Sequence, residues 1–203
     1  MASLVFYDEA HKYTVDGEEV PSVSEITRFM TRELYTDVNQ LALDKAADRG
    51  TKVHKATEAL DKYGSVEIED DLLGYLKAYV SYVKANNPSW EKIEWPVHNE
   101  KLYAGTIDRY GKIGERSGIV DLKTTGTITP GHRAVYTAAQ NLYRMAIEKE
   151  KPVDFIQIVQ LKADGTYRVY ELEIQDELAL ACLALHNAMK KRKRKKKEEE
   201  ESD

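Results

Sequence analysis

Two acidic residues and a lysine stand close together in the stretch GTIDRYGKIGERSGIVDLKTT, residues 105–125. Asp108 lies in one strand-like run, and Asp121 and Lys123 lie at the end of the next. Because side chains on a strand alternate between its two faces, Asp121 and Lys123 project to the same side. The segment GERSG is expected to form a turn that brings Asp108 beside Asp121. Two adjacent carboxylates repel each other unless a cation lies between them, and Mg²⁺ suits oxygen ligands of this kind.

The chemistry that fits these residues is metal-dependent hydrolysis of a phosphate ester. Asp108, Asp121, the backbone carbonyl of Leu122 and water molecules would bind the metal. Lys123 would orient or deprotonate an attacking water, or stabilise the charge that builds on the scissile phosphate. The competing interpretation is a simple ion pair between Asp121 and Lys123 at the edge of a sheet, since acid-x-Lys triplets are common. Other parts of the chain must decide between the two.

The segment RGTKVHKATEAL, residues 49–60, is a helical run with two polar residues on one face. His54 and Glu58 are four residues apart and therefore lie on the same side of a helix. His54 fits either a metal ligand or an ordinary helix histidine. Glu58 fits either the site or an exposed pairing with Lys62, four residues further on. Gly50 interrupts the helix and suggests that another part of the backbone approaches closely at this position.

A second helical segment, YTAAQNLYRMAI, spans residues 136–147. Tyr136, Gln140 and Tyr143 are spaced by four and three residues and share one face. Such a stripe usually packs on a sheet, but Gln140 has a hydrogen-bond donor and an acceptor that apolar packing does not satisfy. Arg49, Lys52 and Lys123 are local cations in an otherwise acidic chain, and cations of this kind would be needed near a phosphate.

These residues must be positioned by a mixture of helices and strands. We expect an N-terminal hairpin over residues 3–21 and a short helix after Pro21, with Ser22 or Ser24 as its N-cap. Helices are then expected at about 37–63, with Asp37 as N-cap, and at about 70–86, 131–149 and 176–190. Strands are expected at 91–98, 101–113, 117–125, 153–162 and 166–174. The order of helix, three strands, helix and two strands predicts an α/β fold, with a central mixed sheet flanked by helices.

The chain has 203 residues, 42% of them apolar, which suits one domain with a real core. We expect a single domain over residues 1–189, made of a leader at 1–36, a core at about 37–175 and a C-terminal helix at 176–189. The low-complexity tail at 190–203 holds eight basic and five acidic side chains, so the rest of the chain is acidic. The tail fits a solvated helix extension or disorder, or an arm that binds phosphate or a partner. Any contact with nucleic acid would then depend on local cations, the tail or bound metal.

Several classes of protein are excluded by what the sequence lacks. No apolar run approaches the ~20 residues of a membrane helix, and the N-terminus has no secretory signal pattern. Cys182 is the only cysteine, so there is no internal disulfide and no CxxC pair for a zinc finger or an iron–sulfur cluster. No glycine-rich phosphate loop is present, so no bound nucleotide is expected. These features favour a cytoplasmic protein.

The pieces RG-xxx-H, GTID, IVDLKTT and a Gln/Tyr helix, in this order, resemble the RecB-type branch of the PD-(D/E)XK nuclease superfamily, which includes phage exonucleases of the lambda type. The resemblance runs over about residues 49–144 and implies a restriction-endonuclease-like core. It implies that His54, Asp108 and Asp121 bind the metal and that Lys123 is the catalytic lysine. Glu58 has no firm equivalent, and we treat it as a candidate for supporting the site or binding a second metal.

The Gln/Tyr helix departs from the pattern of that family. The family usually spaces the two residues as Q-xxx-Y, but Tyr143 follows Gln140 by three residues, and Arg144 stands at the fourth. Tyr136 has the spacing of four in the reverse order. With this difference in spacing, the resemblance implies that Gln140, with Tyr143 or Tyr136, contacts DNA or supports the site.

The resemblance implies a Mg²⁺- or Mn²⁺-dependent deoxyribonuclease of phage or prophage type, working in the cytoplasm of a bacterial host. The implied activity is exonucleolytic, on ends of double-stranded DNA during recombination or repair, with a single-strand annealing or binding protein as partner. Because lambda-type relatives form rings, a homo-oligomer is compatible with it. The alternatives are a structure-specific endonuclease with the same core, a DNA-binding or assembly protein with little catalysis, and a chance match in an unrelated α/β protein.

Overall fold

The computed structural model describes residues 3–7 and 12–200, with side chains as far as residue 192. The chain begins with a small antiparallel sheet of three strands, β1 (Leu4–Tyr7), β2 (Lys12–Val15) and β3 (Glu18–Val20). Asp16 and Gly17 form the turn between β2 and β3, with φ angles of 51° and 79°. The hairpin expected over residues 3–21 is thus part of a three-stranded sheet, although residues 8–11 of that segment lie outside the described ranges.

The larger sheet has five strands in the order β4-β5-β6-β7-β8. Three of the four neighbouring pairs are antiparallel, whereas β6 and β7 are parallel. A parallel pair needs a crossover connection, and helix α4 provides it. The strands are β4 (Ser89–Asn99), β5 (Tyr103–Ile113), β6 (Arg116–Lys123), β7 (Phe155–Leu161) and β8 (Tyr167–Leu172), and α4 is Pro130–Ile147.

The other helices are α1 (Val23–Leu34), α2 (Gln40–Tyr63), α3 (Leu73–Asn86) and α5 (Asp176–Glu200), and the short 3-10 helix η1 (Asp70–Leu72) leads into α3. Ser22 begins α1 through a capping box with Glu25. The N-cap of α2 is Asn39 and not Asp37, because the Asn39 side chain accepts the Leu41 N–H at 2.8 Å.

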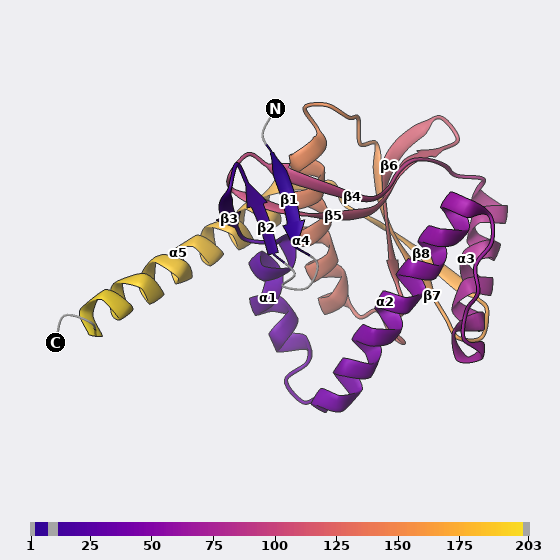
Figure 1. Cartoon of the computed structure of the whole chain (residues 1–203), viewed down its shortest axis with the longest axis horizontal. Coiled ribbons are helices and arrows are strands. Elements are labelled where there is room, and N and C mark those ends of the chain that lie inside the picture. The colour runs from indigo at the N-terminus through magenta and orange to yellow at the C-terminus, as the bar shows by residue number, and fades with distance from the viewer. Residues whose placement is uncertain (1–2, 8–11, 201–203) are drawn as a thin grey trace.

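Helices cover both faces of the five-stranded sheet (Figure 1). On one face, α2 and α3 pack against β6 and β7, and Val120 and Leu122 of β6 belong to this cluster. On the other face, Ile119 packs with residues of β4, β5 and α4. Helices α1 and α5 pack against α4 on its far side. This arrangement confirms the expected α/β class, a mixed sheet flanked by helices, consistent with a restriction-endonuclease-like core.

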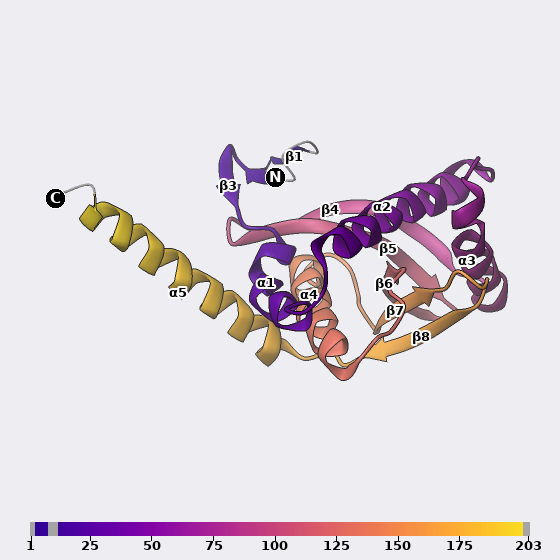
Figure 2. The same ribbon diagram turned by 90° about the horizontal axis from the view of Figure 1, so that it is seen from below.

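Helix α5 continues to Glu200, past residue 189, where we expected the C-terminal helix to end. Ala179, Cys182 and Leu183 pack its first part against α1 and α4. Figure 2 shows the rest of α5 projecting away from the two sheets. None of the helices in the described part of the chain has an apolar stretch long enough to cross a membrane.

Candidate metal centre

Asp121 and Lys123 lie at the centre of the candidate site, at the end of β6. Lys123 Nζ is 2.6 Å from Asp121 Oδ2, and Gln140 Nε2 of α4 donates a hydrogen bond to Asp121 Oδ1 at 2.8 Å. Burial raises the pKa of Asp121 to about 6 against the attraction of Lys123, and repulsion from Asp108 adds to the rise. Burial lowers the pKa of Lys123, but Asp121 and Asp108 raise it by more, so the ammonium stays charged.

Asp108 reaches the same strand end from β5. The paired residues of β5 and β6 end with Arg109 opposite Val120. Beyond that pair, the Asp108 side chain replaces the backbone as hydrogen-bond acceptor, since its Oδ2 accepts the Leu122 N–H at 2.8 Å. The hairpin therefore brings Asp108 to the backbone between Asp121 and Lys123, as its position before the turn indicated.

His54 approaches this point from α2. Its Nε2 lies 2.9 Å from the carbonyl oxygen of Leu122, and its Nδ1 lies 3.5 Å from Asp108 Oδ2. Burial lowers the pKa of His54, but Asp108 and Glu94 outweigh that effect and the pKa rises to about 9. Each ring nitrogen of His54 thus faces an oxygen atom. The candidate ligands His54, Asp108 and the Leu122 carbonyl are thus in mutual contact.

Glu94 is a further acidic residue of the site that the sequence analysis missed. Its neighbours Ile93 and Trp95 pair with Arg109 and Ile107, so Glu94 of β4 lies opposite Asp108 of β5. Glu94 Oε1 is 3.7 Å from His54 Nδ1. Its φ angle is 46°, in the left-handed region that is costly for a residue with a side chain. The strand EKIEWPVH gave no signal of this role, because Glu94 fits the ordinary alternation of polar and apolar residues between Ile93 and Trp95.

A buried arginine, also missed, joins Glu94 to α2. Arg109 is fully buried; its Nε donates to Asp61 Oδ2 at 2.7 Å, its Nη1 to Glu94 Oε1 at 3.2 Å and its Nη2 to Thr57 Oγ1 at 3.1 Å. Tyr79 donates to the same Asp61 oxygen at 2.6 Å. Asp61 and Thr57 follow His54 by seven and three residues, so one face of α2 carries the histidine and both partners of Arg109. This network fixes α2 and β4 relative to the end of β6.

The residues present fit a divalent cation. His54, Glu94 and Asp108 each offer a ligand atom, and these atoms lie within 4.8 Å of one another. Gln140 Oε1 and Asp121 Oδ2 are buried and accept no hydrogen bond from the described residues, the contact of Asp121 with Lys123 being an ion pair. Carboxylate and carbonyl oxygens with one imidazole suit Mg²⁺ or Mn²⁺. The carboxylates of Asp108, Asp121 and Glu94 lie close to one another beside His54, Lys123 and Arg109, and a bound cation would further relieve their repulsion.

The stripe expected on α4 faces the site along its length. The Tyr136 ring lies 5.5 Å from Lys123 Nζ, and Gln140 contacts Asp121 as described. Tyr143 packs over Gly105, where a β-carbon would come within 2.6 Å of the tyrosine ring. All three residues of the stripe therefore lie near the acidic residues, although their spacing differs from Q-xxx-Y.

Three other residues singled out in the sequence lie further from the acids. Lys52 pairs with Glu69 at 3.1 Å, and Glu58 pairs with Lys62 at 2.6 Å, which is the exposed pairing left open above. Arg49 is nearer, since its Nη2 donates to the carbonyl of Thr124 at 3.4 Å, one residue beyond Lys123.

Gly50 does not mark a close approach of the backbone. A β-carbon at this position would lie 3.7 Å from Thr124 Oγ1, which is ordinary van der Waals contact. The expectation of a backbone contact that requires glycine was therefore wrong.

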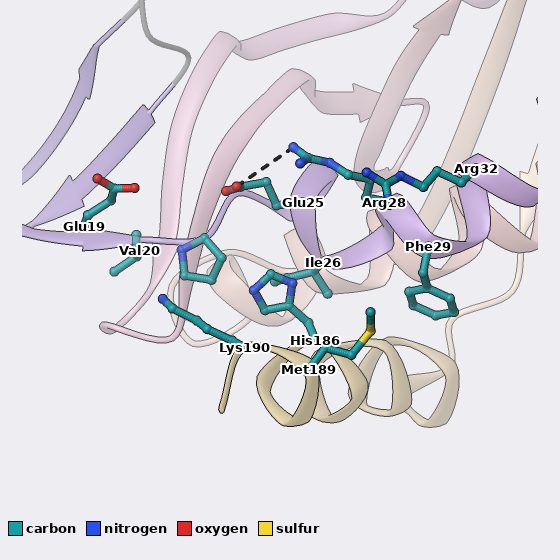
Figure 3. Close-up of a pocket in the computed structure, with 11 residues that line it drawn as sticks. Glu19, Val20, Glu25, Ile26, Arg28, Phe29, Arg32, His186, Met189 and Lys190 are labelled. Atoms are coloured by element: carbon teal, nitrogen blue, oxygen red, sulfur yellow. Dashed lines mark ion pairs between the residues drawn. The ribbon is translucent and has the colours of Figure 1, made fainter. Parts of the chain in front are cut away.

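A separate cavity of about 320 Å³ lies between β3, α1 and α5, as Figure 3 shows. Its lining includes Arg28, Phe29 and Arg32 of α1 and His186 and Met189 of α5. None of the candidate site residues lines it, so it is distinct from the metal centre.

Comparisons with known proteins were made for the sequence and for the fold. No family model and no curated protein matches the sequence. Among solved structures, the chain is similar to an alkaline exonuclease from Laribacter hongkongensis, with a TM-score of 0.40, 14% identity and coverage of 75% of this chain and 92% of that one. It is also similar to the protein SSO0001, with a TM-score of 0.36, 13% identity and coverage of 81% and 84%. Similarity at this level assigns the chain to no family and to no activity.

Proposed function

We propose that this chain is a divalent-metal-dependent deoxyribonuclease that hydrolyses phosphodiester bonds. The observation that carries the proposal is the convergence of His54, Asp108 and Asp121 with Lys123, from a helix and two strands. Residues that only stabilise a fold have no need to gather an imidazole, two carboxylates and a lysine at one strand end. Phosphoryl-transfer chemistry needs such a gathering, since its catalysis is mostly positioning and charge stabilisation.

The residues of the candidate site would have different roles in this reaction. His54, Asp108, Asp121 and the Leu122 carbonyl would hold the cation, with Glu94 as a further carboxylate beside them. When bound, the cation would polarise the scissile phosphate and activate a water at neutral pH. Lys123, held by Asp121 at 2.6 Å, would place its ammonium against the phosphate and stabilise the developing charge. Gln140 orients Asp121 through a hydrogen bond from its Nε2, and its buried Oε1 could accept a hydrogen bond from a water in the site.

The finer assignment follows the family resemblance. We propose Mg²⁺ or Mn²⁺ as the cation and exonucleolytic action on duplex ends, in phage or prophage recombination or repair. A single-strand annealing or binding protein would take up the product strand in the bacterial cytoplasm. Several copies of the chain could assemble around the duplex, as the ring-forming relatives do.

The experiment is cleavage of end-labelled linear duplex DNA with Mg²⁺, with Mn²⁺ and with EDTA, beside a closed circular duplex. The Lys123→Ala variant removes the ammonium at the site, and Lys112→Ala, an exposed lysine on β5, is the matched control. We expect metal-dependent loss of the linear DNA by the wild type and by Lys112→Ala, and a loss of at least 100-fold in rate for Lys123→Ala.

Cutting of the circle would change the proposal to an endonuclease. Equal activity of Lys123→Ala and the wild type would remove Lys123 from the site. Absence of any cleavage with both metals would leave DNA binding without catalysis.

A further inference from the structure

Three aromatic rings lead away from Lys123 between the end of α1 and the start of α4. The Tyr136 ring lies 5.5 Å from Lys123 Nζ, the His132 ring lies 6.2 Å from Tyr136, and the Tyr35 ring lies 5.6 Å from His132. All three side chains are partly exposed. We call Tyr35, His132 and Tyr136 the aromatic row.

Local structure holds the aromatic row in place. His132 belongs to the capping box of α4, and its Nδ1 is 2.7 Å from Thr129 Oγ1, which restrains the ring. Gly131 lets α1 approach α4, because a β-carbon there would meet the Leu34 side chain at 2.6 Å. Tyr35 follows Leu34 directly, so this close approach sets the tyrosine against His132.

Packing of the core accounts for only part of the row, since Tyr136 packs against the cluster of Ile156, Ile158 and Leu172. Tyr35 belongs to none of the hydrophobic clusters formed by the described residues. Tyr35 and His132 meet edge to face with their planes inclined by 72°, and the planes of His132 and Tyr136 are inclined by 50°, so each contact covers at most one face of a ring. The row therefore offers ring faces to another molecule beside the candidate site.

The charges around the row select the kind of molecule. Burial lowers the pKa of His132, so this ring is neutral at pH 7 and does not attract phosphate as a cation. The site beyond Tyr136 contains the carboxylates Asp121 and Asp108. An uncharged planar group suits such surroundings, and stacking on aromatic side chains is how proteins hold unpaired nucleobases.

We propose that the aromatic row binds the unpaired bases of a single strand, so that the strand entering the site is unpaired next to the scissile phosphate. A base inside a duplex already has both faces covered by its neighbours, and would have to leave the stack to reach the row. The inference rests on the proposed function for the position of the phosphate at Lys123. The stacking itself requires no cleavage and can be measured apart from it.

The test uses the full-length protein in EDTA, where a metal-dependent enzyme does not cut. Its ligands are a single-stranded oligonucleotide carrying 2-aminopurine and a blunt duplex of the same sequence. Stacking is measured by quenching of the 2-aminopurine fluorescence, and affinity is measured by anisotropy of an end label. We expect quenching on the single strand and tighter binding of the single strand than of the blunt duplex.

Matched variants distinguish weaker binding caused by the loss of a stacking ring from weaker binding caused by a change in the local structure. Tyr35→Ala removes one ring, whereas Tyr35→Phe keeps the ring and removes only the hydroxyl. His132→Gln removes the second ring but keeps a side chain that can complete the capping box of α4. Tyr63→Ala, at the end of α2, where the side chain is 78% exposed, is the distant control.

We expect Tyr35→Ala and His132→Gln to weaken single-strand binding roughly 5- to 150-fold, the equivalent of about 1–3 kcal/mol per stacked base. Tyr35→Phe and Tyr63→Ala should bind like the wild type, and duplex affinity should change less than twofold. The inference is overturned if the wild type gives no quenching, if Tyr35→Phe loses as much as Tyr35→Ala, or if duplex and single strand weaken equally.

The outcome is distinct from that of the cleavage assay. Quenching without any cleavage in metal would retain the aromatic row as a nucleic-acid site and reject the nuclease. Cleavage by a wild type that gives no quenching would retain the nuclease and reject the row.

Discussion

Arg109 carries a full positive charge inside the protein, where a charge survives only with partners. Asp61, Glu94 and Thr57 supply them, and burial lowers the pKa of Arg109 less than Tyr79 and Asp61 raise it. Arg109→Met should lower the free energy of unfolding by roughly 3–5 kcal/mol, because the carboxylates are left buried and unpaired. Urea denaturation followed by circular dichroism measures this change.

The control for this loss is an arginine on the next strand. Arg116 pairs with Glu171 at 2.8 Å, but both side chains are about half exposed. Arg116→Ala should cost less than about 1 kcal/mol, as exposed ion pairs do. Equal effects of the two substitutions would mean that the buried network does not fix α2 and β4.

Glu94 is expected to bind the cation directly, since its carboxylate lies in one cluster with His54 and Asp108. Glu94→Gln keeps the shape of the side chain but removes the charge, and should weaken Mn²⁺ binding at least tenfold in isothermal titration calorimetry. Glu91→Gln, in an exposed pair with Lys151 on the same strand, should leave the affinity unchanged. Unchanged affinity in Glu94→Gln would restrict Glu94 to supporting Arg109.

Among the residues of the candidate site, the sequence predicted those whose spacing along the chain determines where their side chains lie. Asp121 and Lys123 share a strand face, and Asp108 precedes a tight turn, so alternation and pairing bring them together. Glu94 and Arg109 escaped because their role depends on contacts between β4, β5 and α2. Nothing in a single strand's pattern distinguishes a charge that faces water from one that faces a buried partner.

Gly118 shows how closely strands β6 and β7 approach each other. A β-carbon at Gly118 would lie 2.4 Å from the backbone oxygen of Phe155, the residue opposite it in the parallel pair. Gly118→Ala should therefore lower the free energy of unfolding by about 1–3 kcal/mol, since the backbone must shift. Thermal unfolding measures the loss.

Gly126 is the matched glycine for that experiment. It follows the end of β6, and a β-carbon there would meet nothing within 4 Å. Gly126→Ala should change stability by less than about 0.5 kcal/mol. A loss as large as that of Gly118→Ala would argue that flexibility after β6, and not crowding between the strands, sets the cost.

The elements were predictable where a local signal marks them, as Ser22 does at the start of α1. The start of α2 was misplaced because Asp37 and Asn39 are both good N-caps, and only the folded backbone selects between them. The third strand of the small sheet was missed because Glu18–Val20 is too short to show alternation. Its existence depends on pairing with β2.

For the whole molecule, cation binding and folding are linked, because the ligands come from α2, β4, β5 and β6 and meet only in the folded state. A ligand that binds the native state alone stabilises it by about 2.7 kcal/mol at 100 times its Kd. Saturating Mn²⁺ should therefore raise the melting temperature by several degrees, and EDTA should reverse the rise.

Asp108→Asn tests this linkage. The asparagine amide oxygen can still accept the hydrogen bond from the Leu122 N–H, so the fold is preserved. The negative charge that would bind the cation is lost. The variant should melt near the wild type in EDTA and gain little from Mn²⁺. An equal gain in the variant and the wild type would place the cation elsewhere on the molecule.

Because the backbone of Glu94 is left-handed, protein stability and metal-dependent activity favour different residues at position 94. A residue with a side chain pays roughly 1 kcal/mol for this conformation, whereas glycine adopts it freely and asparagine at lower cost. In the Arg109→Met background, where the ion pair with Glu94 is already lost, a library at position 94 that is sorted for resistance to proteolysis should therefore enrich glycine and asparagine. The same library sorted for metal-dependent cleavage should return glutamate.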